Sequence, residues 1–389
     1  MRLFCVAVYN GCIEKRGVMR LNKSQSTAAD IGDYCKVFAF TAVVSQPIMA
    51  SLLNASTTHQ SQLVIGLLYD LVKYTAPAFI FGILYSMIRT HDHLLFDLRQ
   101  YYRHTWSLLF VPSIWWTMIY LLFMPWLQQV SHWHNFSTFC WQFINGNAAP
   151  HLWYNSMMLQ YIILVPVFWV MSRWVGHNRW RGLLVAIVTL LAYLAWLAYY
   201  DYYVFHGPHM HNWYLLDRLF VSFLIYAVYG MLAWQFRDLY QRWVVRLLPV
   251  IIVAFFAILV WTNRELFGFG FPVSLYNATY YKPSMTAYCL VIIALISVSF
   301  IVDCRTHNSR RLYIMHFVAT YAHRAFLSNL FWEQLCWQGL QMHRYAASHP
   351  LLVLLATWGL TWLLSVNSAW LIHRGWLVIK HELKIREGS

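Results

Sequence analysis

The chain has 389 residues, of which 60% are hydrophobic and only 11% charged, whereas an ordinary soluble domain carries roughly 25% charged residues. This composition argues against a soluble globule, and the 19% of aromatic residues excludes a disordered or fibrous chain. The net charge of +14 would suggest a nucleic-acid partner in a soluble protein. Here the positive residues lie in short loops between apolar segments, which instead indicates a lipid bilayer as the partner and no nucleic acid.

Ten apolar segments approach the length of about 20 residues that a helix needs to cross a membrane. In chain order they are Cys35–Asn54, Leu63–Ile88, Trp106–Leu127, Leu152–Ser172, Gly182–Tyr200, Leu215–Phe236, Val244–Thr262, Met285–Val302, Leu312–Trp332 and Leu351–Leu371. We therefore predict an all-α fold, a polytopic transmembrane bundle of about ten helices that forms one domain over residues 30–375. Residues 1–29 and 376–389 are predicted as a cytoplasmic N-terminal segment and a cytoplasmic C-terminal tail.

The basic residues alternate between the loops and so test this count. Of the 28 Lys and Arg residues, 21 precede the first segment or follow the even-numbered ones, and only four lie in the loops of the opposite side. By the positive-inside rule both termini are then cytoplasmic. We expect an integral protein of a bacterial cytoplasmic membrane.

The first predicted helix combines a cation with a proline. Lys36 begins the segment and is either an interfacial anchor or a ligand contact, and Gln46 and Pro47 follow after about 15 Å of helix. Pro47 is expected to kink the helix and to free a carbonyl group near the bundle centre.

The second predicted helix carries two charges at membrane depth. Asp70 and Lys73 are three positions apart on one helix face, which favours a structural ion pair. The alternative is that Lys73 belongs to an anion-binding cavity for a phosphate or a carboxylate.

The ninth predicted helix contains His316, His323 and Arg324 within nine residues. A spacing of seven places the two histidines on the same face, two turns apart. Histidine in a membrane cavity is either a proton acceptor for a hydroxyl group or a packing residue bonded to a carbonyl, and the sequence leaves both open.

Other chemical motifs are weak. The pairs His132/His134 and His209/His211 lack a third ligand, so we predict no metal site. No phosphate-binding loop, dinucleotide glycine pattern or serine nucleophile elbow occurs, and no tightly bound cofactor is expected.

From about Asp30 to His373 the chain resembles the family-3 membrane acyltransferases. His151-Leu-Trp-Tyr, followed by Tyr161 and Pro166, resembles the start of the family's fourth helix, and Leu312-Tyr-Ile-Met-His316 resembles its penultimate helix. Lys73-Tyr-Thr-Ala-Pro resembles a third family segment, without the Ser-Gly that normally follows it. The chain departs from the family in the first helix, where Pro47 stands eleven residues after Lys36 in place of the family's catalytic histidine.

The resemblance implies O-acetylation or a related modification of a cell-envelope polysaccharide, with acyl-CoA as co-substrate and a glycan or a lipid-linked sugar as acceptor. In this scheme His316 or His151 is the catalytic base. Donor or anion binding falls to six cations: Lys73, Lys36, Arg99, Arg103, Arg310 and Arg311. Two alternatives stay open: a non-catalytic relative that binds or moves a substrate across the membrane, and a secondary transporter.

Overall fold

The computed structural model describes residues 29–55, 58–91, 97–205 and 207–387, and side chains up to residue 378. Within these ranges every regular element is helical and no strand occurs. Eight helical segments in this part of the chain are long and apolar enough to cross a membrane, or nine if one bent helix pair counts as a single span. The chain is thus an all-α integral membrane protein, as predicted.

The spans correspond to the following elements. Three spans are built from consecutive helices: α2 (Ile31–Val43) with α3 (Ser45–Ala55), α4 (His59–Leu71) with α5 (Thr75–His91), and α6 (Leu98–Thr105) with α7 (Val111–Phe123). Single helices form the others: α9 (Leu152–Val175), α10 (Arg179–Tyr203), α13 (Leu248–Phe267), α14 (Pro283–Arg305) and α16 (Pro350–Glu387).

The sixth and ninth predicted segments differ from simple spans. In the sixth, α11 (Leu224–Gln235) has only 12 residues and is followed by α12 (Arg237–Arg246) at an angle of 103°. The ninth is a continuous helix, α15 (Ser309–Gln334), that does not pass as an apolar span. It packs against α2, α7, α14 and α16, and its polar residues Ser328, Asn329 and Glu333 are buried.

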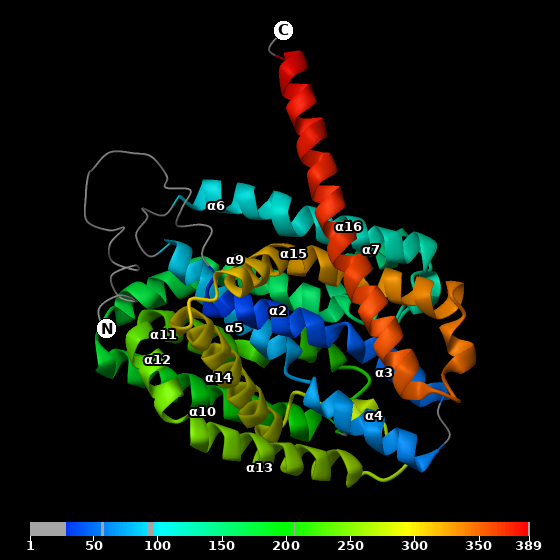
Figure 1. Cartoon of the computed structure of the whole chain (residues 1–389), viewed down its shortest axis with the longest axis horizontal. Coiled ribbons are helices and arrows are strands. Elements are labelled where there is room, and N and C mark those ends of the chain that lie inside the picture. Colours follow the sequence, from blue (N-terminus) through cyan, green and yellow to red (C-terminus); the bar gives the residue numbers. More distant parts are fainter. Residues whose placement is uncertain (1–28, 56–57, 92–96, 206, 388–389) are drawn as a thin grey trace.

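The last helix of the chain runs past the predicted domain limit at residue 375. Residues 1–28 lie outside the described residues, and α16 continues without a break to Glu387. The expected boundary at residue 375 therefore falls inside a helix. Figure 1 shows this helix crossing the bundle and extending beyond it.

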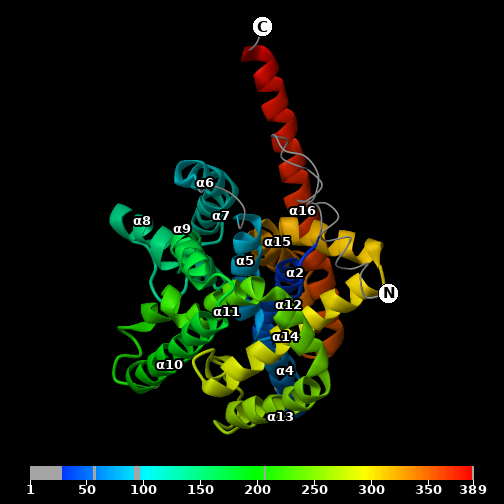
Figure 2. The ribbon, with the colours of Figure 1, turned by 90° about the vertical axis from the view of Figure 1, so that its left-hand side faces the viewer.

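The centre of the bundle consists of α2, α5 and α15. Figure 2 shows these three helices in the middle, with α6 and α7 on one side and α10 and α13 on others. A Cβ on Gly82 of α5 would lie 2.7 Å from the carbonyl oxygen of Gly32 on α2, and a Cβ on Gly230 of α11 would lie 2.5 Å from the Phe81 oxygen. Helix α5 thus meets the backbones of two neighbours, the close approach that glycine permits between membrane helices.

Two of the central spans are interrupted. The regular helix is broken at Val44, between α2 and α3, and over Val72–Tyr74, between α4 and α5. The freed carbonyls at the second break are satisfied by side chains: Gln46 Nε2 donates to the Val72 oxygen at 3.1 Å, and the Tyr288 hydroxyl donates to the Leu71 oxygen at 2.8 Å. A break inside a membrane span is stable when neighbouring helices satisfy it in this way.

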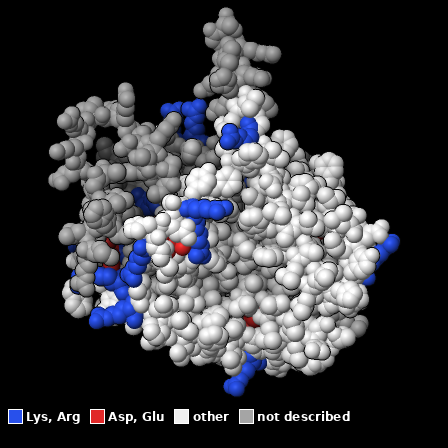
Figure 3. All heavy atoms as spheres, viewed as in Figure 1, with Lys and Arg blue, Asp and Glu red and all other residues white. Residues whose placement is uncertain are grey.

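Charge is concentrated toward one end of the molecule, while most of the face in Figure 3 is free of it. At the start of α2 the acidic side chains are paired. Asp30 lies 3.0 Å from Arg89, and Asp33 lies 2.7 Å from Lys36. The first contact joins the beginning of α2 to the end of α5, and the second lies within α2.

Candidate functional site

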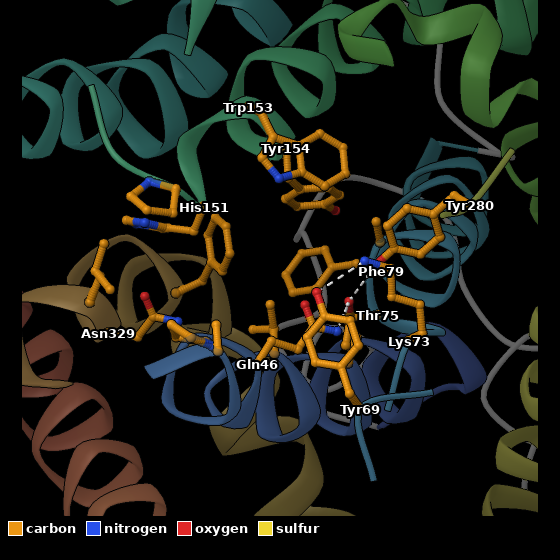
Figure 4. Close-up of a pocket in the computed structure, with 18 residues that line it drawn as sticks. Gln46, Tyr69, Lys73, Thr75, Phe79, His151, Trp153, Tyr154, Tyr280 and Asn329 are labelled. Carbon is orange, nitrogen blue, oxygen red and sulfur yellow. Dashed lines mark hydrogen bonds between the residues drawn. The ribbon is translucent and has the colours of Figure 1, made fainter. Parts of the chain in front are cut away.

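A cavity of about 180 Å³ lies among α2, α3, the α4/α5 break, the start of α9 and α15. Two of the predicted site residues, Lys73 and His151, line it, and so does Pro47. Figure 4 shows His151 and Asn329 toward one end and Lys73 with Tyr69 and Tyr280 toward the other. The remaining walls are largely aromatic, with Phe79, Trp153, Tyr154 and Phe326.

Lys73 lies in the break between α4 and α5 and is surrounded by aromatic rings. Its Nζ donates to the Tyr69 hydroxyl at 3.2 Å and lies 4.8 and 4.6 Å from the centroids of the Tyr69 and Tyr280 rings. Cation–π contacts of this kind stabilise a partly desolvated ammonium by about 1–2 kcal/mol. They hold the charge at the cavity wall without neutralising it.

The predicted ion pair between Asp70 and Lys73 is not a direct contact in the described structure, although the two groups still interact electrostatically. Helix α4 ends at Leu71, so the two residues no longer share a helix face. The Asp70 side chain instead lines a separate small cavity together with Thr262, Glu265 and Lys282. Thr262, the neighbour best placed to donate to it, donates to the Leu259 carbonyl oxygen at 3.1 Å. Lys73 is therefore a cation that forms no direct ion pair with a carboxylate among the described residues.

His151 immediately precedes α9, and its ring lies between those of Tyr120 and Phe326, with centroids 5.3 and 5.2 Å away. Its Nε2 lies 3.4 Å from the Leu327 carbonyl oxygen, whereas Nδ1 is buried and has no hydrogen-bond partner in the described structure. Burial lowers the pKa of His151 to about 4. The imidazole is thus neutral at pH 7, and with Nε2 as the donor its Nδ1 carries a free lone pair.

Tyr120 of α7 fixes the part of α15 that faces His151. Its hydroxyl donates to the Leu327 carbonyl oxygen at 2.8 Å and accepts from the Phe331 amide at 3.2 Å. The hydroxyl therefore bridges two backbone groups that are four residues apart, the spacing of a helical hydrogen bond. Sequence reasoning missed this residue, because a tyrosine in an apolar segment gives no signal of such a role.

Two further polar groups of the cavity were also missed. Both amide atoms of Asn329 and the hydroxyl of Tyr154 are buried and lack a hydrogen-bond partner in the described structure. Buried polar groups are nearly always satisfied, so these atoms indicate a ligand or ordered water in the cavity. An asparagine inside the ninth apolar segment was a signal that sequence reasoning could have used.

The structure places His316 away from this cavity. Its Nδ1 lies 2.8 Å from Asp33 Oδ2, and Asp33 also pairs with Lys36. His323, two turns further along α15, has its Nε2 3.3 Å from Asn155 Oδ1. The two histidines thus serve different contacts, and neither reaches Lys73.

The four predicted donor-binding arginines are accessible at helix ends. Arg99 and Arg103 are exposed on α6, and Arg310 is exposed in the first turn of α15. Arg311 pairs with Asp303 at 3.2 Å, which anchors it to the end of α14. In the described residues no three His, Cys, Asp or Glu side chains are grouped to hold a metal ion.

The described structure is that of a helical membrane protein with a partly open, aromatic and cationic cavity among its central helices. Comparisons of the chain with protein-family models, with curated proteins and with solved structures found no match. The function therefore has to be argued from the cavity itself.

Proposed function

We propose that this chain is an integral membrane O-acyltransferase. It takes an acyl group, an acetyl group in the simplest case, from acyl-CoA at the cytoplasmic face and passes it to a hydroxyl of a cell-envelope glycan or a lipid-linked sugar. The observation that supports this best is one cavity that contains both a neutral imidazole with a free Nδ1 and a lysine that forms no direct ion pair with a carboxylate among the described residues. These are the two groups that acyl transfer to a hydroxyl requires.

In the proposed reaction the acceptor hydroxyl attacks the thioester carbonyl while His151 Nδ1 removes its proton. A C–O bond forms, the C–S bond breaks, and the departing sulfur receives a proton, so that one O–H bond is exchanged for one S–H bond. Lys73 stabilises the negative oxygen of the tetrahedral intermediate, and the Asn329 amide and the Tyr154 hydroxyl supply further hydrogen bonds. Because His151 is a weak base, it acts only together with this stabilisation of the oxyanion.

The place of Pro47 supports this assignment of the base. Proline cannot accept a proton, and Pro47 stands where the resembling family has its catalytic histidine. Yet Pro47 and His151 line the same cavity. In this proposal His151, at the start of α9, takes the role of the histidine that the resembling family has in its first span.

The acyl donor is proposed to approach from the charged end. The phosphates of coenzyme A suit the exposed Arg99, Arg103 and Arg310, because arginine binds phosphate with two hydrogen bonds at once. Arg311 and Lys36 also lie near helix ends, and we include them among the proposed donor contacts. Asp33 contacts both His316 and Lys36, and we propose that His316 is a further contact for the acyl donor. The aromatic walls of the cavity suit the apolar face of a sugar ring.

A second candidate function is substrate binding or transport without chemistry. Its support is the pair of interrupted spans, joined by the bond from Gln46 to Val72. Discontinuous helices with free backbone groups are the typical binding sites of secondary transporters. This function would need neither the lone pair of His151 nor an acyl donor.

The deciding experiment uses purified protein in lipid vesicles with radiolabelled acetyl-CoA on the side of the charged end and a lipid-linked sugar as acceptor. We expect label in the acceptor that mild alkali releases, as for an ester. His151→Gln should lower this rate by about 10²–10⁴-fold, while His177→Gln, a change at an exposed histidine, should leave it intact. Labelled sugar that crosses the membrane without becoming esterified would instead establish transport.

A further inference from the structure

A buried polar seam runs between α15 and α16, next to the cavity. On α15, Asn329 and Glu333 are one turn apart and are 1% and 0% exposed. On α16, Thr357, Thr361 and Ser365 follow each other at intervals of four, which places them on one helix face, and all three are fully buried.

This face of α16 is directed at α15. Ser368, which shares the face, accepts a hydrogen bond from the indole of Trp332 on α15 at 3.0 Å. Cys336, just beyond α15, interacts electrostatically with both Thr361 and Glu333. The hydroxyls and the carboxyl therefore occupy the same interface between the two helices.

The polar atoms of the seam are poorly satisfied by the protein. Glu333 Oε2 accepts from Gln334 Nε2 at 2.8 Å, but Oε1 has no partner in the described structure. The same holds for both amide atoms of Asn329 and for the hydroxyls of Thr357 and Ser365, and the Thr361 hydroxyl has only the Cys336 thiol beside it. Each unsatisfied buried group costs about 1–3 kcal/mol. Ordered water is the usual way in which membrane and globular interiors avoid that cost.

The surroundings of Glu333 do not balance a negative charge. In the part of the chain that the structure describes, no cation forms an ion pair with it. The titratable groups that interact with it are the Cys336 thiol and the Tyr120 phenol, and Tyr120 in turn packs against His151. An uncompensated carboxylate at such a place costs several kcal/mol, so the surroundings favour the protonated form of the carboxyl group.

We propose that the α15–α16 seam holds a file of water molecules leading from Asn329, at the wall of the cavity, to Glu333, whose carboxyl group stores a proton that it exchanges with the cavity. The seam is a proton site in its own right. Its use in catalysis rests on the proposed function.

During acyl transfer the water file lets the weakly basic His151 pass on the proton that it takes from the acceptor hydroxyl. That proton goes to Glu333, while Glu333 gives its stored proton through the water file to the leaving sulfur. One O–H bond is broken and one S–H bond is formed, so the cycle consumes no proton. Glu333 touches neither substrate and is a positioning residue for the proton.

The test is infrared spectroscopy of the intact protein in lipid vesicles at neutral pH, which does not depend on enzymatic activity. We expect a carbonyl band of a protonated carboxyl group that shifts when H₂O is replaced by D₂O. Glu333→Gln should remove one component of this band, and Asp201→Asn, at an exposed position on α10, should not. If the wild-type protein shows no protonated carboxyl band, or if Glu333→Gln leaves the band complete, the proposal is wrong.

The water file is tested separately on protein that retains Glu333. Thr361→Val keeps the shape of the side chain and removes one hydroxyl from the seam, so deuterium exchange of the Glu333 band should slow about tenfold or more. Thr320→Val, at an exposed position of α15, should leave that rate unchanged. Equal exchange rates in the two variants would overturn the water file, whether or not the protein transfers acyl groups.

Discussion

The side-chain amide of Gln46 donates a hydrogen bond to the carbonyl oxygen of Val72, 3.1 Å away, and so ties the interruption of the first span to that of the second. The same Nε2 lies 3.3 Å from Thr75 Oγ1, at the first residue of α5. Lys73 stands between these two contacts. The position of the cavity's cation thus depends on a residue from another helix.

Replacing Gln46 with Leu should therefore destabilise the protein. The Val72 oxygen would lose its donor in a partly buried place, which costs about 1–3 kcal/mol. The midpoint of thermal unfolding in detergent, followed by tryptophan fluorescence, should fall. Gln100→Leu, at an exposed position of α6, provides the control, and an equal midpoint for both variants would contradict the bridging role of Gln46.

The acyl-transfer rate should stay high well below the ordinary pKa of histidine. Burial lowers the pKa of His151 to about 4, so Nδ1 remains unprotonated until the pH approaches that value. Measured at saturating donor, the rate should fall on the acid side with a midpoint near pH 4. A midpoint near 6.5, the ordinary pKa of a histidine, would contradict His151 as the base.

The same shift predicts how stability depends on pH. The unfolded chain binds a proton at this histidine below about pH 6.5, whereas the folded protein does so only near pH 4. Stability from this group is therefore complete above pH 6.5 and is lost as the pH falls toward 4. Comparing the unfolding midpoints of the wild type and His151→Gln across this range measures the effect, which should be smaller in the variant.

Lys73→Met should lower the transfer rate without emptying the site. Methionine keeps the length and the apolar stem of the side chain and removes only the charge that faces the oxyanion. Loss of one such stabilising group costs about 10²–10³-fold in kcat. The KM for the acceptor, determined in the same vesicle assay, should change much less, and a selective rise in KM would instead assign Lys73 to substrate binding.

Restoring a histidine at position 47 discriminates between the two proposed functions. Pro47 and His151 face one cavity, so Pro47→His in the His151→Gln background returns an imidazole to the site. For an acyltransferase we expect part of the transfer rate to return. A protein that only binds or transports its substrate would show no transfer in either variant.

The composition, the apolar segments and the rare charges at membrane depth were enough to predict most of the fold and part of the site. The sequence predicts Lys73 and His151 as site residues, and both line one cavity. The pairing of Asp70 with Lys73 failed because the spacing rule assumes an unbroken helix, and nothing near Val72 marks the break.

Contacts between distant segments were not predictable. Asp33 and His316 are 283 positions apart, and their bond depends on how α2 and α15 are placed in the bundle. The ninth segment is a helix, as predicted, but its Asn329 and Glu333 are buried and do not face lipid. Their side chains instead form the seam and one wall of the cavity, which only the packing of α15 against its neighbours could reveal.

The glycine contacts of α5 limit how the molecule can move. The backbone of α5 lies directly against α2 at Gly82 and against α11 at Phe81, with no side chain between the helices at these points. Rotation or sliding of α5 there would produce a clash. The α2–α5–α11 contacts therefore form the part of the bundle with the least room for rearrangement. The interruptions at Val44 and Val72–Tyr74 are the places where the backbone of the first two spans is not a continuous helix, and Lys73 lies in the second of them.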